Sequence, residues 1–226
     1  MKLKNLFLGD IKFQIKYGFY FIYLIFTLLY IVSLTILPTD WIKETSWILI
    51  FTDPSIMGLV FMGAIVQLEI SEKTFNSLAV APIKSSEYLL SKLLSLAFLS
   101  LVVSLILGIY ANSISNYLTF IIGILMGSII FSSIGLILAF KSKSLNQFIL
   151  YIIPIMLLIV LPGIFYIFGK DNPWFIIHPG IAIVAMISSK GSFILSLISL
   201  TTWLGITYYL AFKLVNKNLK KICGEK

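Results

Sequence analysis

Apolar residues fill the chain in six long runs, and short polar segments separate them. A helix needs about 20 residues to cross about 30 Å of hydrocarbon. The pattern therefore predicts an all-α, polytopic membrane protein, a single domain with six transmembrane helices. The expected spans are residues 19–37, 54–70, 88–111, 118–140, 148–168 and 192–212. The second is the shortest, and Asp53 and Pro54 are residue types that favour a helix start there.

Composition excludes a soluble globular protein. The 226 residues are 59% hydrophobic and 12% charged, whereas soluble domains average about 45–50% apolar and about 25% charged residues. A soluble fold of this size could not hide so much apolar surface from water.

Lysines set the expected orientation. The segments between spans must lie alternately on the two sides of the membrane. Of the 17 basic residues, which are all lysines, only Lys43, Lys170 and Lys190 fall in the segments on one of these sides, the expected outer side. Cytoplasmic loops carry the excess of positive charge, so both termini are expected in the cytoplasm.

The absence of arginine is typical of an AT-rich bacterium, so we expect the bacterial cytoplasmic membrane. Membrane flanks explain the net charge of +8 better than nucleic acid does.

Two segments are expected to lie along the membrane. Residues 2–16 have the pattern of an amphipathic interfacial helix, with a frayed lead-in as the alternative. The outer segment 169–190 contains the apolar run 181–187, which is too short to span and is expected to be a re-entrant or interfacial helix. The polar sector of the first helix holds Lys2, Asn5, Gly9, Lys12 and Lys16.

The sequence carries no catalytic or metal motif. There is one histidine, His178, and neither HExxH nor GxxxxGK[ST] occurs. We therefore expect no cofactor bound by this chain. Ion-coupled carriers place carboxylates at mid-membrane depth, but the acidic residues are expected at helix ends or in loops, Asp53 among them, with Glu69 at most one turn deep. If the protein transports, its energy is expected from a partner.

A charged insert, residues 68–92, interrupts the apolar pattern between spans two and three. It is expected to form a short helix, about 71–82, with Ser71 as its cap and Pro82 at its end. Ser85 or Ser86 would cap the next helix. Phe75 and Leu78 form an apolar stripe that suits either docking into a groove of another protein or resting on the lipid interface.

The insert resembles the permease subunits of type-2 ABC transporters. That family has an acidic and a basic residue at the inner end of span two, a leucine and a proline after them, and an acidic residue and a lysine opening span three. Its usual glycine is absent here, and Thr74 and Phe75 stand near its place. The strings 10–20 and 51–54 are most similar to fluoroquinolone export permeases. The matching positions in the insert are Glu72, Lys73, Leu78, Pro82, Ile83, Glu87 and Lys92.

The resemblance implies a division of labour. The short helix would couple a separate ABC ATPase subunit, which binds ATP and Mg, to the spans. A second permease copy or a homologous permease would complete the exporter of a small amphipathic compound, such as a drug. A toxic peptide, lipid or glycan is the alternative cargo, and a membrane assembly or sensor subunit is the alternative class. The expected coupling residues are Glu69, Glu72, Lys73, Phe75, Leu78, Pro82, Ile83, Glu87 and Lys92.

Two further patterns predict contacts inside the membrane. Tyr20, Tyr23, Thr27 and Tyr30 share one face of span one, and this face is expected either to line a substrate path or to pack against another helix. Small residues in span four favour close helix packing. They are Gly123, Gly127, Ser128, Ser132 and Gly135.

Overall fold

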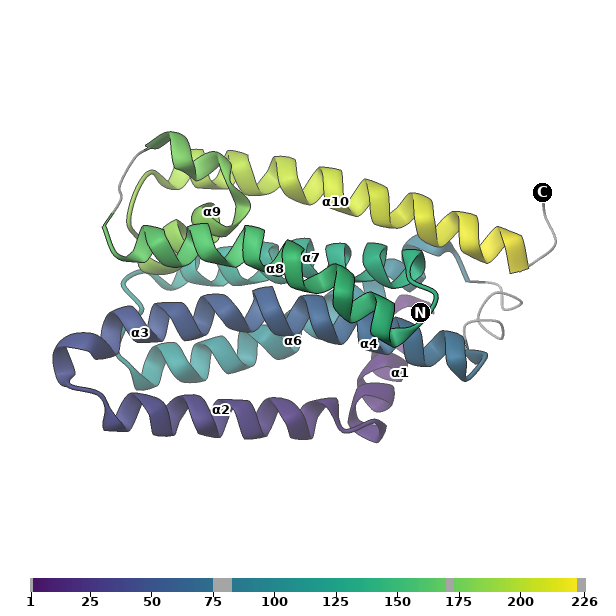
Figure 1. Cartoon of the computed structure of the whole chain (residues 1–226), viewed down its shortest axis with the longest axis horizontal. Coiled ribbons are helices and arrows are strands. Elements are labelled where there is room, and N and C mark those ends of the chain that lie inside the picture. The colour runs from purple at the N-terminus through teal and green to yellow at the C-terminus, as the bar shows by residue number, and fades with distance from the viewer. Residues whose placement is uncertain (1, 75–82, 170–172, 223–226) are drawn as a thin grey trace.

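The computed structural model describes residues 2–74, 83–169 and 173–222, and its regular structure over these ranges is helical throughout. The long helices run side by side, and α1 lies across their direction at one end of the bundle (Figure 1). The elements are α1 (Lys2–Lys16), α2 (Phe19–Ile36), α3 (Thr39–Thr52), η1 (Asp53–Met57), α4 (Gly58–Ser71), α6 (Ser85–Tyr110), α7 (Tyr117–Lys141), α8 (Leu145–Ile167), η2 (Pro173–Ile177), α9 (Pro179–Ser188) and α10 (Phe193–Ile222).

Six helical segments are long and apolar enough to cross a membrane, which confirms the predicted number of spans. They are α2, the continuous stretch Thr39–Ser71, α6, α7, α8 and α10. We call the end of the bundle that carries α1 the α1 end. The last turn of α10 lies at this same end (Figure 1), as an even number of spans requires.

The second span begins earlier than predicted. It is one segment of 33 residues, from Thr39 to Ser71, and residues 39–53 are helix rather than an outer loop. Asp53 and Pro54 do not start a helix. They open the π-helical turn η1 between α3 and α4, where the wider ring accommodates the proline. The cause is the apolar face of α3, whose side chains Trp47, Ile50 and Phe51 are buried.

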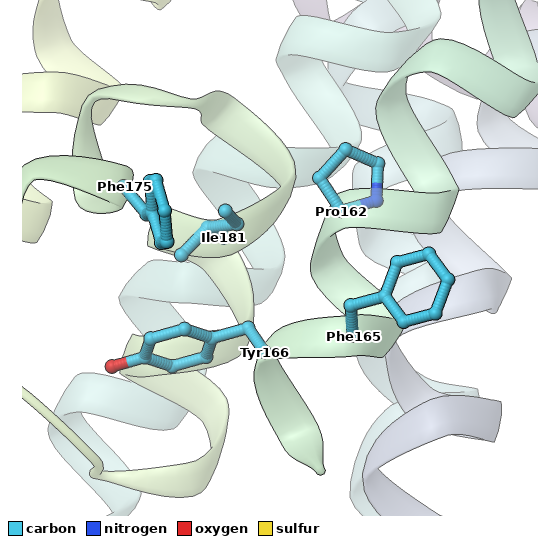
Figure 2. A pocket seen from close by; sticks show the side chains of 5 residues that line it. All are labelled: Pro162, Phe165, Tyr166, Phe175 and Ile181. Atoms are coloured by element: carbon cyan, nitrogen blue, oxygen red, sulfur yellow. The ribbon is translucent and has the colours of Figure 1, made fainter. Parts of the chain in front are cut away.

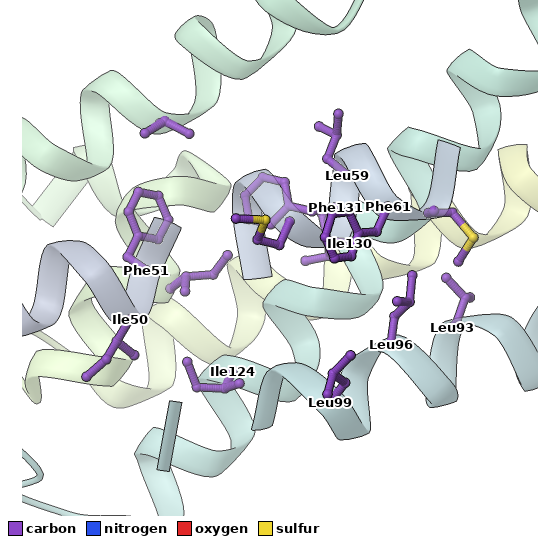
Figure 3. Packing of buried hydrophobic residues seen from close by; sticks show 14 of the residues in the cluster. Ile50, Phe51, Leu59, Phe61, Leu93, Leu96, Leu99, Ile124, Ile130 and Phe131 are labelled. Atoms are coloured by element: carbon purple, nitrogen blue, oxygen red, sulfur yellow. The ribbon is translucent and has the colours of Figure 1, made fainter. Parts of the chain in front are cut away.

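The core forms where α4, α6 and α7 meet. Their apolar stretches are 56–65% buried, whereas those of α2, α8 and α10 are 17–22% buried and face outward. Figure 3 shows Leu59 and Phe61 of α4 beside Leu96 of α6 and Phe131 of α7. The outer helices therefore expose apolar side chains to lipid or to another membrane protein.

Close approach of α4 and α7 depends on glycine. A Cβ at Gly135 would lie 2.2 Å from the carbonyl oxygen of Leu59, a separation that no side chain can adopt without moving the backbone. A Cβ at Gly123 or at Gly127 would lie 2.9 Å from a side-chain atom of Met186 or of Ile183 in α9. Ser132 donates a 3.4 Å hydrogen bond to the Gly58 carbonyl, and Ser128 lies beside it. The stripe of small residues in α7 therefore faces α4 and α9.

The short helix α9 is too short to span, as predicted, and every one of its ten residues is buried. It packs among α7, α8 and α10 at the end opposite α1 (Figure 1). The predicted re-entrant or interfacial segment is therefore enclosed by the protein.

The ends of the charged insert differ in detail from the prediction. Ser71 is the last residue of α4, and its hydroxyl donates to the Leu68 carbonyl. Lys73 then adopts a left-handed conformation. Helix α6 begins at Ser85, with Lys84 as its N-cap, one residue before the predicted cap, because the Glu87 carboxylate accepts from the Lys84 N–H at 3.0 Å. Most of the predicted coupling helix, residues 75–82, lies outside the described residues.

Candidate functional site

A buried ion-pair cluster joins three helices at the α1 end. Lys92 of α6 places its Nζ atom 2.9 Å from Oδ1 of Asp10 on α1 and 2.5 Å from Oε1 of Glu69 on α4. Lys92 and Glu69 are almost fully buried. Charges withdrawn from water are tolerated only when they are paired and hydrogen-bonded, so the cluster fixes the mutual position of α1, α4 and α6.

Hydroxyl groups complete the cluster. Tyr88 donates a 2.7 Å hydrogen bond to Oε2 of Glu69, and Ser91 donates to Oδ2 of Asp10. The ammonium group of Lys92 also lies 4.9 Å from the centre of the Tyr88 ring, within the range of a cation–π contact. Each carboxylate therefore has a partner at both oxygens. We call Asp10, Glu69, Tyr88, Ser91 and Lys92 the ion-pair cluster.

Two more contacts hold α1 against the bundle. Gln14 is buried and donates a 2.7 Å hydrogen bond to Ser95 of α6. Tyr17, just after α1, donates to the carboxylate of Glu72, and this hydrogen bond raises the pKa of the Tyr17 hydroxyl. Asp10, Gln14 and Tyr17 follow one another at helical spacing. This polar face of α1 is the signal that sequence reasoning missed, because it treated α1 only as an interfacial helix.

The residues predicted to couple to an ATPase divide into two groups. Glu69 and Lys92 are buried in the ion-pair cluster, whereas Glu72 and Lys73 are exposed. Ile83 and Glu87 are half-buried at the start of α6. Phe75, Leu78 and Pro82 lie outside the described residues. The structure thus brings Glu69, Glu72, Lys73 and Lys92 to one place, where only Glu72 and Lys73 are open to a protein outside the chain.

Asp53 lies in the interior of the bundle, which overturns its predicted place at a helix end. It is fully buried in the π-helical turn η1. Its Oδ2 atom accepts a 2.9 Å hydrogen bond from Ser100 of α6, and its Oδ1 atom has no hydrogen-bond partner among the described residues. The prediction failed because Asp53-Pro54 has the form of a helix start, while the helix runs through it.

Two residues of the predicted substrate-path face of α2, Tyr23 and Tyr30, lie near this carboxylate. Tyr23 and Thr27 are buried, and Tyr20 and Tyr30 are half-buried. Thr27 donates to the Tyr23 carbonyl at 2.7 Å, so its hydroxyl is satisfied within α2. The Tyr23 hydroxyl has no hydrogen-bond partner among the described residues.

An apolar pocket of about 180 Å³ opens at the end opposite α1. Pro162, Phe165 and Tyr166 of α8 line one side, and Phe175 and Ile181 line the other (Figure 2). A larger groove of about 460 Å³ adjoins it, beside His178 and Trp203. Apart from His178, the lining residues that the structure describes are uncharged and mostly apolar.

His178 has a structural partner rather than a catalytic one. Its imidazole makes a hydrogen bond to the backbone of Leu158, while burial lowers its pKa. Pro162 lacks the N–H that would normally bond to the Leu158 carbonyl four residues earlier. The histidine therefore supplies the donor that the proline removes from α8.

Comparison with known proteins agrees with this architecture. The family described as the fluoroquinolones export permease protein family matches residues 2–222. Two relatives carry the name fluoroquinolones export permease protein, from Mycobacterium tuberculosis strains CDC 1551 / Oshkosh and ATCC 25618 / H37Rv. Each is 26% identical over 123 residues, which cover 54% of this chain and 52% of the relative, so the chain matches about half the length of these relatives. From the family match across nearly all its residues, the chain belongs to the fluoroquinolones export permease protein family.

Proposed function

We propose that this chain is the permease subunit of an ATP-driven exporter, and that it moves a small amphipathic compound, such as a fluoroquinolone, out of the cell. The observation that carries the proposal is the family match over residues 2–222, together with six spans. The name of the two relatives supports a drug as cargo. Energy would come from ATP hydrolysis in a separate ABC ATPase subunit.

The α1 end is the place where that ATPase would dock. Glu72 and Lys73 are exposed there, directly before residues 75–82. The ion-pair cluster supports this assignment, because it joins α4, which ends at Ser71, to α1 and α6. A push on the insert would then move these helices together, as coupling between two discrete states requires.

The orientation follows from the lysines. Lys141 and Lys143 lie with α1 at one end of the bundle, while Lys43 and Lys190 share contact with Trp47 at the other. The α1 end would therefore face the cytoplasm of a bacterial cell, with both termini inside. Labelling with a membrane-impermeant maleimide tests this in a chain whose Cys223 is replaced by serine. Lys43→Cys should react in intact cells, and Lys143→Cys only after lysis.

The apolar outer faces leave room for a second permease. Helices α2, α8 and α10 are the least buried of the spans. A second copy of this chain or a homologous permease would cover part of that surface, and lipid would cover the rest. A toxic peptide, lipid or glycan is the alternative cargo, and an assembly or sensor subunit is the alternative class.

Co-purification is the experiment that tests the function. The full chain with a C-terminal tag is extracted in two mild detergents, and bound proteins are identified by mass spectrometry. An ABC-type ATPase recovered in near-equal amounts supports the proposal. Its absence in both detergents, with the permease recovered intact, contradicts the ATP-driven mechanism.

A further inference from the structure

Asp53 is a carboxylate inside the bundle that forms no ion pair with any residue that the structure describes. Both ion pairs of the described residues involve Lys92, which precedes Ser100 by two turns of α6. Asp53 is fully buried, and only its Oδ2 atom accepts a hydrogen bond. An ionised carboxylate in such surroundings costs several kcal/mol. A protein that retains this group in its interior requires a use for it.

The carboxylate lies deep within the membrane-spanning part. Asp53 comes 14 residues after Thr39 and 18 residues before Ser71, which places it about 21 Å and about 27 Å from the two ends of the segment. Its partner Ser100 also lies away from both ends of α6. The hydrocarbon core is about 30 Å thick, so water reaches Asp53 only through the protein.

Hydroxyl groups from α2 and α6 lie near the carboxylate. Tyr23 and Tyr30 of α2 lie near Asp53. The Tyr23 ring meets Phe61 edge-on, with centroids 5.0 Å apart. The hydroxyls of Tyr23 and Ser104 are buried and have no hydrogen-bond partner among the described residues. Carboxylate, hydroxyl and aromatic face together form the set that recognises an organic ammonium ion.

Helix α2 is the cover of this site. Of its 18 residues only Phe19, Tyr23, Thr27 and Leu34 are buried, so little apolar surface holds it to the bundle. Asp53 is fully buried, so its carboxylate is closed off from solvent in this arrangement. Separation of α2 from α4 and α6 would open the carboxylate at the smallest loss of buried surface.

From these contacts we infer that Asp53 is a cation-binding group of the export path, and that it receives the protonated amine of the transported compound. The ring and hydroxyl of Tyr23 complete the site. This inference rests on the proposed export function and adds its substrate class: a basic, amphipathic, aromatic compound. It also gives the α2 face a definite role.

Direct binding to the full chain in lipid nanodiscs tests the inference without an ATPase. Three fluorescent probes, which share the same carboxylate, are compared at pH 7 by anisotropy: ciprofloxacin, its N-methyl derivative, whose amine remains protonated, and its N-acetyl derivative, which carries no basic amine. The wild-type chain should bind both amines about tenfold or more tightly than the N-acetyl compound, as one charged hydrogen bond implies. Asp53→Asn should abolish this preference while leaving N-acetyl binding unchanged, and Asp53→Glu should retain it.

The matched control is Asp40→Asn, which alters an exposed carboxylate of α3 and should leave all three affinities as in the wild type. An amine preference that is absent in the wild type, or unchanged in Asp53→Asn, overturns the inference.

If Asp53→Asn does not fold, Tyr23→Phe replaces it, because it removes only a hydroxyl without a protein partner among the described residues. Amine binding weakened about threefold then supports the site, and unchanged binding overturns it. If the wild-type chain shows the amine preference but no ATP-driven export after reconstitution, the result counts against the proposed function and not against the binding site.

Discussion

His178 makes a hydrogen bond to the backbone of Leu158, in the turn of α8 where Pro162 removes the normal backbone donor. The contact ties α8 to the start of α9, since His178 directly precedes that helix. A proline in a membrane-spanning helix is tolerated when another group satisfies the freed carbonyl. Here a side chain from the next element does so.

This relationship predicts a non-additive pair of mutations. His178→Ala should lower the free energy of unfolding by about 1–3 kcal/mol, because it leaves a buried carbonyl unpaired. In a Pro162→Ala background, the N–H of residue 162 can bond to the Leu158 carbonyl. Adding His178→Ala to this background should therefore lower the free energy of unfolding much less than it does in the wild type. Thermal unfolding of the four proteins in detergent measures the coupling. Equal losses in both backgrounds would show that His178 does not serve Leu158.

The same histidine predicts a dependence on pH. Burial lowers the pKa of His178 below its ordinary value of about 6.5, so the folded state favours the neutral ring. Its contribution to stability is present above about pH 6.5 and is lost as pH falls through the folded-state pKa. The wild type should therefore lose more stability than His178→Gln between pH 7.5 and pH 5. Equal losses would contradict the assignment.

The ion-pair cluster predicts a strong effect of removing its cation. Lys92→Met leaves Asp10 and Glu69 buried without a positive partner, which should cost about 3–5 kcal/mol. The triple variant that combines Lys92→Met with Asp10→Asn and Glu69→Gln should recover most of this lost stability, because no charge remains in the cluster. Thermal unfolding is the readout, and Lys213→Met, on an exposed lysine of α10, is the control. A triple variant no more stable than Lys92→Met would argue against charge as the cause.

The crossing of α4 and α7 predicts opposite outcomes at two glycines. Gly135→Ala must push away the Leu59 backbone and should destabilise the protein by about 1–3 kcal/mol. Gly205→Ala, in α10 with open space around it, should cause no loss, because alanine favours helix. Unfolding midpoints of both variants decide the matter. Similar values would mean that the crossing can relax.

The contact between Tyr17 and Glu72 predicts how the insert acts on transport. If Glu72 contacts the ATPase, Glu72→Ala should reduce substrate-stimulated ATP hydrolysis several-fold, and Tyr17→Phe should reduce it far less. If Glu72 serves only to hold α1, the two variants should be equally impaired. ATPase assays of the reconstituted complex separate these results, with Asp40→Ala at the opposite end as the control.

Sequence reasoning reached the spans because their length and apolarity are local properties. It could not reach the ion-pair cluster, since Asp10 and Lys92 are 82 residues apart and no local pattern links them. It misplaced Asp53 for a different reason: the dipeptide Asp53-Pro54 satisfies the rules for a helix start. Only packing of Trp47, Ile50 and Phe51 reveals that the helix has already begun.

The π-helical turn at Asp53–Met57 also determines how this segment can vary. Such a turn holds one more residue than an α-turn, and each residue of an α-helix corresponds to about 100° of rotation. Deleting one residue there would not shorten the span appreciably. It would convert the wide turn into an ordinary α-turn, so α3 and α4 would keep nearly the same faces toward the bundle, whereas a deletion within α3 or α4 would rotate one helix by about 100° relative to the other. Related chains that differ by one residue between Thr39 and Gly58 should therefore be aligned by helical phase, with the acidic residue as the marker.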